Sequence, residues 1–220
     1  MLKDKIFISS FASISALGNT SDEIWENYLR GSALFTTKKY QGETSYISQL
    51  NKEGKLAVED LKSNNDRYKD LDDSVLYAIL SARKTIEKSS WDQTDFGVNI
   101  GSSRGATSLF EKFHQQYLEE GKTAALASPT TTLGNISSWV LQDLGSNGPE
   151  LSHSITCSTA LHSILNGVAW LNSGMAHRFL VGGSEAPLTP FTIAQMKAVK
   201  LYANYKKGEL YPNSSLEIDN

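Results

Sequence analysis

Residues 150–173, ELSHSITCSTALHSILNGVAWLNS, carry the only cysteine of the chain at the point where a strand pattern gives way to a helix pattern. Residues 150–156 follow a turn signal rich in glycine and are typical of a brief buried strand. Apolar side chains then recur with the spacing of one helix face, at Leu161, Ile164, Leu165, Val168 and Leu171. Gly174 supplies a helix stop. The pattern therefore predicts that Cys157 lies at or just before the first turn of a helix.

This position would favour chemistry at the Cys157 thiol. The first backbone N–H groups of a helix lack intrahelical partners and, together with the helix dipole, stabilise a neighbouring anion. A thiolate nucleophile is favoured there, and the same N–H groups could hold an oxyanion during acyl transfer. A lone cysteine is also often a small buried apolar side chain. The residues by themselves leave both interpretations open, a nucleophile and a packing residue.

Several separated segments resemble the β-ketoacyl-acyl carrier protein synthases, in the order that this family has. Around Cys157, a Gly-Pro turn, a Thr-Cys-Ser-Thr run and a Val-Gly-Gly-Ser-Glu strand end are similar to the family's nucleophile region. The matching segments are residues 5–31 (KIFISSFASISALGNTSDEIWENYLRG), 97–105 (GVNIGSSRG), 129–131 (PTT), 148–149 (GP), 156–159 (TCST) and 181–185 (VGGSE). The resemblance covers nearly all of the chain up to about residue 200.

The resemblance implies an α/β fold of the thiolase-like type, with this chain as the N-terminal half of a layered α-β-α-β-α fold with a mostly parallel sheet. It implies an acyltransferase of fatty acid or polyketide biosynthesis that uses no cofactor. An acyl group would be transferred to Cys157, and malonyl-acyl carrier protein would then undergo a decarboxylative Claisen condensation with it. The implied partners are acyl carrier protein and a second subunit, in a homodimer or a heterodimer.

The resemblance also assigns two substrate-binding positions and points to a missing part. Arg104 occupies a position that lines the acyl tunnel, where relatives usually carry an apolar residue. An arginine at this position implies one of two things. Either the tunnel binds a short or unusual acyl group, or Arg104 lies on an exposed loop and its side chain points away from the tunnel. Thr131 lies in a segment implied to bind substrate. The family's two catalytic histidines and its active-site lysine belong to a C-terminal half that is absent from this sequence. The chain is thus expected to be a nucleophile half, as a fragment, a shortened expression product or a split subunit.

Two other functions remain open at this point. A non-catalytic partner subunit of a ketosynthase-like heterocomplex would explain the missing half, although relatives of that kind usually replace the cysteine that Cys157 matches. A thiolase-like enzyme acting on coenzyme A thioesters is the third possibility. The Thr-Cys-Ser-Thr-Ala and Gly-Gly-Ser-Glu runs resemble the synthases more closely.

Composition excludes several other classes of protein. The 220 residues include 40% hydrophobic and 20% charged side chains with a formal net charge of −3, which is typical of a soluble globular chain that does not bind nucleic acid. A single cysteine suits a reducing compartment, so a cytoplasmic protein is expected. Residues 6–17 could mimic a secretion signal, but serines dilute the run and a buried strand is favoured. No stretch approaches the length of a membrane span, and no residue spacing indicates a metal site.

Strands and helices alternate along the chain, which predicts a largely parallel sheet. Strands are expected at residues 4–11, 96–101, 150–156 and 177–183, and helices at 20–31, 71–88, 106–120, 134–143, 158–173 and 190–201. Residues 32–70 are mostly polar and are interpreted as an irregular surface excursion. Residues 1–205 would form the N-terminal half of the synthase, and residues 206–220 a loose polar tail.

The four histidines are interpreted as structural or surface residues. Along a strand His153 would lie about 13 Å from Cys157, and along a helix His162 would lie about 7.5 Å from it. Both distances exceed hydrogen-bond reach. His114 and His177 are assigned to a helix surface and a strand entry. Glu185 is expected to anchor the turn after its strand rather than to act in catalysis.

Overall fold

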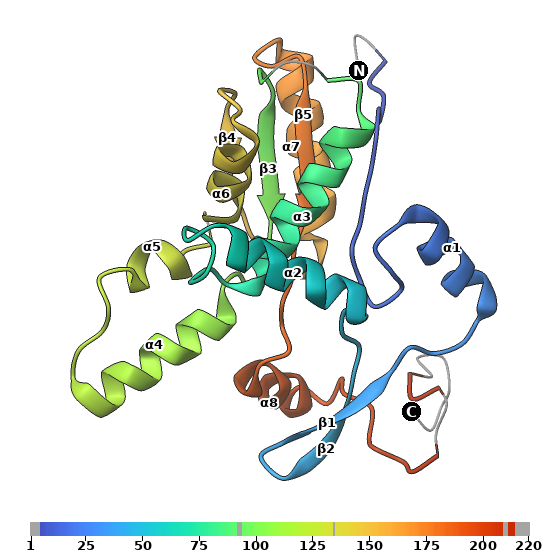
Figure 1. The fold of residues 1–220 in the computed structure, drawn as a ribbon, viewed down its shortest axis with the longest axis vertical. Helices are drawn as coiled ribbons and strands as arrows, with labels where there is room; N and C mark the ends of the chain where they lie inside the picture. Colours follow the sequence, from blue (N-terminus) through green and yellow to red (C-terminus); the bar gives the residue numbers. More distant parts are fainter. Residues whose placement is uncertain (1–4, 92–93, 134, 209–210, 214–220) are drawn as a thin grey trace. The chain divides into compact units, whose positions relative to one another are not determined.

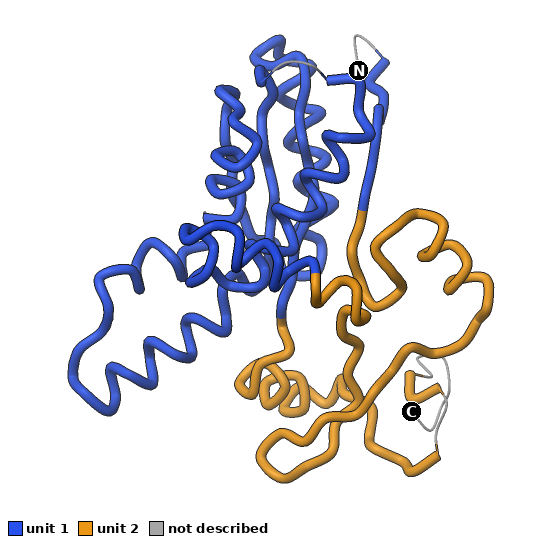
Figure 2. The backbone as a smooth tube through the Cα atoms, in the orientation of Figure 1, with its two compact units in different colours: residues 1–12, 57–186 blue, residues 13–56, 187–220 orange. Residues whose placement is uncertain are grey.

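The computed structural model describes residues 5–91, 94–133, 135–208 and 211–213 and divides the chain into two compact units. Unit 1 comprises residues 1–12 and 57–186 and unit 2 comprises residues 13–56 and 187–220, as coloured in Figure 2. In chain order the elements labelled in Figure 1 are α1 (Ser21–Arg30), β1 (Thr36–Tyr40), β2 (Glu43–Ile47), α2 (Lys52–Asn64), α3 (Asp73–Lys88), β3 (Gly97–Gly101), α4 (Thr107–Glu120), α5 (Ala127–Thr131), α6 (Asn135–Leu144), β4 (Glu150–Leu151), α7 (Thr159–Ser173), β5 (Phe179–Gly183) and α8 (Pro190–Ala198), and a 3₁₀ turn, η1 (Thr156–Ser158), precedes α7.

A parallel sheet of three strands, in the order β4-β3-β5, forms the centre of unit 1. β3 is buried at all five positions because it pairs on both sides, with β5 along its whole length. Parallel strands need crossover connections, and α7 lies in the connection that leads from β4 past β3 to β5, while it packs on β3 and β5 (Figure 1). The predicted parallel α/β arrangement is confirmed. The strand expected at 150–156 is shorter than predicted, because β4 has only two residues.

The core of unit 1 lies between β3 and the helices α3 and α6. Leu76 and Ile79 of α3 and Val140 of α6 are fully buried. α3 begins at its cap Asp72, whose side chain accepts a hydrogen bond from the Ser74 N–H at 2.9 Å. The predicted helix at 71–88 is therefore confirmed, although it begins two residues later, at Asp73. Within the described residues, no helix is long and apolar enough to span a bilayer.

α7 meets the sheet through small side chains. Its buried residues are Thr159, Ser163 and Gly167, and the Ser163 hydroxyl donates to the Gly182 carbonyl at 2.9 Å. A Cβ added at Gly167 would lie 2.7 Å from Val181 Cγ1, so the helix could not approach as closely with a larger residue. The predicted apolar stripe exists, but it faces away from the sheet: Leu161, Ile164 and Leu165 are 62%, 43% and 57% exposed.

In unit 2 the described residues form a hairpin, α1, α8 and the first residues of α2. β1 and β2 pair antiparallel through a two-residue turn in which Gln41 and Gly42 both have positive φ, as a type I′ turn requires. Tyr40 and Ile47 of this hairpin form a small core with Ile193 of α8. The helix predicted at 20–31 begins at a capping box, because the Glu23 N–H donates to Thr20 Oγ1 and the Glu23 carboxylate accepts from the Asn19 N–H.

Two expectations for the first third of the chain are wrong. Residues 5–11 form no strand, and Phe7, Ile8 and Phe11 are largely exposed; residue 4 lies outside the described residues. A strand is stable only when a neighbour pairs with it, and the residue pattern does not reveal whether a partner exists. Residues 32–70 are not irregular, because they form the hairpin and α2.

Candidate active site

Cys157 lies on the η1 turn directly before α7, as the change of pattern predicted, and it is exposed. The residue that caps α7 is Ser158, whose hydroxyl donates to the Ile155 carbonyl at 3.0 Å and makes no capping hydrogen bond to the helix. The Ser158 N–H donates to the Ile155 carbonyl at 3.2 Å and the Thr159 N–H donates to the Thr156 carbonyl, so both donors are engaged within the turn. Because the positive end of the α7 dipole lies at this turn, negative charge at or near the sulfur is favoured.

The backbone of this turn is held in an unusual conformation. Thr156 has φ +46°, in the left-handed region that a β-branched residue rarely adopts. Thr159 holds the turn through its hydroxyl, which accepts from the Ile155 N–H at 2.8 Å and donates to the Thr156 carbonyl at 2.6 Å. Such strain costs about 1–3 kcal/mol and persists only where surrounding contacts impose it. One side chain that follows Cys157 thus holds the two residues that precede it.

The loops that follow the strands converge on the residues before Cys157. Ser154 donates to the Ser103 carbonyl at 3.4 Å, and the Ser103 N–H donates to the Glu185 carboxylate. The Ser184 N–H also donates to the Gly101 carbonyl at 3.0 Å. Glu185 therefore links the loop after β5 to the loop after β3, which agrees with the anchoring role expected for it. The edge formed by the carboxyl ends of parallel strands is where α/β folds bind ligands.

The histidines nearest Cys157 are engaged with backbone carbonyls. His153 Nε2 lies 3.0 Å from the Thr159 carbonyl oxygen, and His162 Nδ1 lies 3.0 Å from the Ser158 carbonyl oxygen. A carbonyl only accepts, so each of these ring nitrogens carries a proton. His114 stacks on Phe110 of α4 with the two ring planes 3° apart. These contacts agree with the structural roles expected for the histidines.

The two residues expected to bind substrate lie on other elements. Arg104 is partly buried in the loop between β3 and α4, and its carbonyl accepts from the Thr107 hydroxyl at 3.2 Å. Thr131 is the last residue of α5, and its hydroxyl donates to the Ala127 carbonyl at 2.6 Å. That donor is therefore already engaged in the helix. The substrate-binding roles of Arg104 and Thr131 stay predictions.

Sequence reasoning missed a polar group beneath the Cys157 turn. Asn99 lies in the middle of β3 and is fully buried, and its side chain contacts Asn166 of α7 and His153. The signal was an asparagine in the centre of the run GVNIG, because a polar residue inside a buried strand needs partners.

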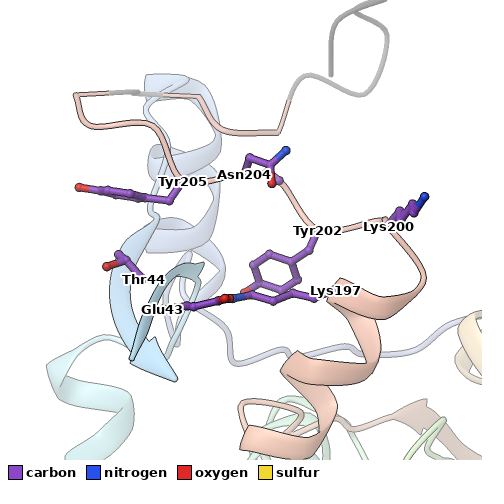
Figure 3. Close-up of a pocket in the computed structure, with 8 residues that line it drawn as sticks. Glu43, Thr44, Lys197, Lys200, Tyr202, Asn204 and Tyr205 are labelled. Atoms are coloured by element: carbon purple, nitrogen blue, oxygen red, sulfur yellow. The ribbon is translucent and has the colours of Figure 1, made fainter. Parts of the chain in front are cut away.

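Unit 2 contains a pocket of about 460 Å³ (Figure 3). Glu43 and Thr44 of β2, Lys197 of α8, Lys200 and residues 202–205 line it. Lys197 forms an ion pair with Glu43 at 2.8 Å on its wall. None of its lining residues belongs to the Cys157 turn. Among the residues that the structure describes, no cluster of histidine, cysteine and carboxylate side chains is placed to hold a metal ion.

Comparison with known proteins identifies the family. The family model described as "Beta-ketoacyl synthase, N-terminal domain" matches residues 3–212. The 3-oxoacyl-[acyl-carrier-protein] synthase 2 of Vibrio cholerae serotype O1 is 26% identical over 208 residues, which cover 91% of this chain and 50% of that protein. The synthase of the same name from Staphylococcus aureus strain N315 is 26% identical over 202 residues, covering 88% and 49%. The chain thus spans about half the length of the curated relatives it matches.

Solved structures show the same fold. A ketosynthase in complex with its type II PKS acyl-carrier protein gives a TM-score of 0.74 at 16% identity, covering 92% of this chain and 50% of that one. A β-ketoacyl synthase from Burkholderia phymatum gives 0.67 at 16% identity, covering 91% and 50%. The α/β architecture is therefore that of the thiolase-like ketosynthases, as expected from the sequence. The chain belongs to the β-ketoacyl synthase family and corresponds to its N-terminal half.

Proposed function

We propose that this chain is the nucleophile half of a β-ketoacyl-acyl carrier protein synthase and that Cys157 is its acyl acceptor. The observation that carries the proposal is the presentation of Cys157, which is exposed on a strained turn at the start of α7. A cysteine that served only in packing would be buried. The names and domain match of the relatives support the same chemistry.

The reaction would occur in two steps at this sulfur. The Cys157 thiolate attacks the carbonyl carbon of an acyl thioester, backbone N–H groups at the start of α7 stabilise the oxyanion, and the carrier leaves as a thiolate, which takes up the proton that the Cys157 thiol had lost. A malonyl thioester then loses carbon dioxide, and the resulting carbanion attacks the Cys157-bound carbonyl. The new carbon–carbon bond forms as the Cys157 thiolate is released. The second step would use the two histidines that the family resemblance assigns to the C-terminal half.

The exposed face of α7 supports the participation of that second half. Leu161, Ile164 and Leu165 form a contiguous apolar stripe on the side of α7 away from the sheet. Because relatives are about twice as long as the matched segment, a second half of the layered fold is available to cover this stripe, within one chain or as a separate subunit. Covering it would bury an apolar surface of the kind that marks interaction sites. A homodimer or heterodimer located in the cytoplasm is part of the same proposal.

The wider assignment follows from the family. Acyl carrier protein would deliver both substrates, in fatty acid or polyketide biosynthesis, and residues 1–205 would act as one functional half with residues 206–220 leading out of it. Arg104 and Thr131 would contact the acyl group. One structural neighbour is itself a ketosynthase bound to an acyl-carrier protein, which supports this choice of partner.

Acylation of the chain tests the proposal directly. The protein is incubated with an acyl thioester and examined by intact mass spectrometry, with Cys157→Ala and Ser154→Ala as the test and control variants. We expect one acyl adduct in the wild type and in Ser154→Ala, and none in Cys157→Ala. An adduct that persists in Cys157→Ala would refute the nucleophile assignment. The lack of any adduct in the wild type would favour a non-catalytic partner subunit.

A further inference from the structure

The buried amide of Asn99 has a defined orientation. Asn99 Nδ2 lies 2.8 Å from the Leu151 carbonyl oxygen and 3.1 Å from His153 Nδ1, and Asn99 Oδ1 lies 3.0 Å from Asn166 Nδ2. The Leu151 carbonyl can only accept, so the NH₂ group of Asn99 must face Leu151 and His153. A flipped amide would place two oxygens against each other at Leu151. The donor of Asn99 is therefore fixed toward His153.

This orientation also fixes the protonation of His153. Nδ1 faces a donor and must accept, whereas Nε2 faces the Thr159 carbonyl at 3.0 Å and must donate. The hydrogen bonds therefore match the tautomer that carries its proton on Nε2. His153 thereby connects the centre of β3 to the first residue of α7.

Thr159 is the point where this connection reaches the nucleophile. Its carbonyl accepts from His153, and its hydroxyl bonds both the Ile155 N–H and the Thr156 carbonyl. Thr159 is 3% exposed, and a Cβ at Gly101 would lie only 2.2 Å from Thr159 Cγ2. Tight packing and hydrogen bonds thus hold the residue that clamps the turn around Cys157.

We propose that His153 is a positioning residue for Cys157, an inference that rests on the proposed function. His153 binds the Thr159 carbonyl and so holds Thr159 in place. The Thr159 hydroxyl in turn holds Thr156 in its conformation with positive φ. Without that bond the strained turn can relax, and the Cys157 sulfur loses its fixed place before the first turn of α7. The reactive form of the thiol would then lose its stabilising neighbours.

Alkylation of Cys157 by iodoacetamide tests this inference without any acyl transfer. His153→Leu removes both ring hydrogen bonds, and the loss of the one to the Thr159 carbonyl should slow alkylation of the folded chain about fivefold. His153→Gln keeps an N–H donor near the Nε2 position and should restore the rate, whereas His153→Asn keeps only the acceptor near Nδ1 and should not. His114→Leu is the control, because His114 stacks on Phe110 of α4.

Two patterns of rates would overturn the inference. One is an alkylation rate in His153→Leu equal to that of His114→Leu. The other is an equal alkylation rate in His153→Gln and His153→Asn. Both rates are measured under conditions in which the variants are folded, as established by urea unfolding. If His153→Leu fails to fold, the Gln and Asn variants decide the question. Failure of acylation combined with the expected alkylation pattern would remove the proposed function and leave the positioning role in place.

Discussion

Replacing Gly101 by alanine should destabilise unit 1, because the end of β3 has no room for a side chain. A Cβ at Gly101 would lie 2.2 Å from Thr159 Cγ2 and 3.2 Å from His153 Cε1. The first distance is far below the contact distance of about 3.5–4 Å between carbon atoms, so the start of α7 must move. Overpacking a dense site costs about 1–3 kcal/mol, and we expect Gly101→Ala to lower the free energy of unfolding by about 2 kcal/mol.

Gly182 provides the matched control on the adjacent strand. It lies directly opposite Ile100, and a Cβ there would meet only Ile100 Cδ1 at 3.5 Å, which is an ordinary contact. Gly182→Ala should therefore stay within about 0.5 kcal/mol of the wild type. The two variants add the same methyl group to neighbouring strands, so any difference between them reports the closeness of α7.

A double-mutant cycle locates the clash. Thr159→Ser removes Cγ2 but keeps the hydroxyl that holds the turn, at a cost of about 1 kcal/mol for the lost buried methyl group. The double variant Gly101→Ala, Thr159→Ser has the added Cβ but lacks Cγ2, so the clash is gone. Its loss of unfolding free energy should therefore be about 1–2 kcal/mol smaller than the sum of the losses in the two single variants. Urea unfolding of the four proteins measures this coupling. An additive cycle, or Gly101→Ala as stable as Gly182→Ala, would refute the tight approach of α7 to β3.

Three other variants probe the remaining contacts. The Asp143 side chain is 2% exposed and accepts two hydrogen bonds from the half-exposed Arg83. Asp143→Asn should therefore lower the free energy of unfolding by about 1–3 kcal/mol, and an unchanged urea midpoint would contradict this. Burial raises the pKa of the Asp72 carboxyl, so its contribution to folding is fully present below about pH 4 and is lost as pH rises through the raised pKa. The wild type should therefore lose stability relative to Asp72→Asn as pH rises from 4 toward 7 in urea unfolding, and a constant difference would argue against it. Leu165→Asp should leave the stability of this chain within about 0.5 kcal/mol of the wild type but weaken its association with a C-terminal half in sedimentation; a large loss of stability would place Leu165 in the core.

Local signals predicted the elements whose determinants lie within a few residues. The capping residues Thr20 and Glu23 start α1, and Gly174 ends α7 in the left-handed conformation that a helix stop favours. The position of Cys157 was predictable for the same reason, because a change of period in the sequence marks the boundary between elements. Such signals need no knowledge of tertiary partners.

The hairpin of unit 2 was missed because its strands carry little apolar alternation. β1 reads TTKKY, and four of its five residues are exposed. Only its last residue, Tyr40, and the end of β2 bury side chains, so the pattern resembled a polar loop. Its turn is Gln41-Gly42, a weaker turn signal than the Asn-Gly or Asp-Gly pairs that usually mark such hairpins.

The orientation of α7 could not be read from its periodicity, because a helical stripe gives a period but not the neighbour that it faces. A helix lying on a sheet usually turns its apolar stripe inward. Here Ser163 bonds the Gly182 carbonyl and Gly167 leaves room for Val181, which only small side chains permit. Leucines turned toward the sheet would push the helix outward and separate Thr159 from His153. The close approach that fixes the Cys157 turn and the outward-facing apolar stripe are therefore one feature of the helix, and this stripe is the surface that the proposed second half would cover.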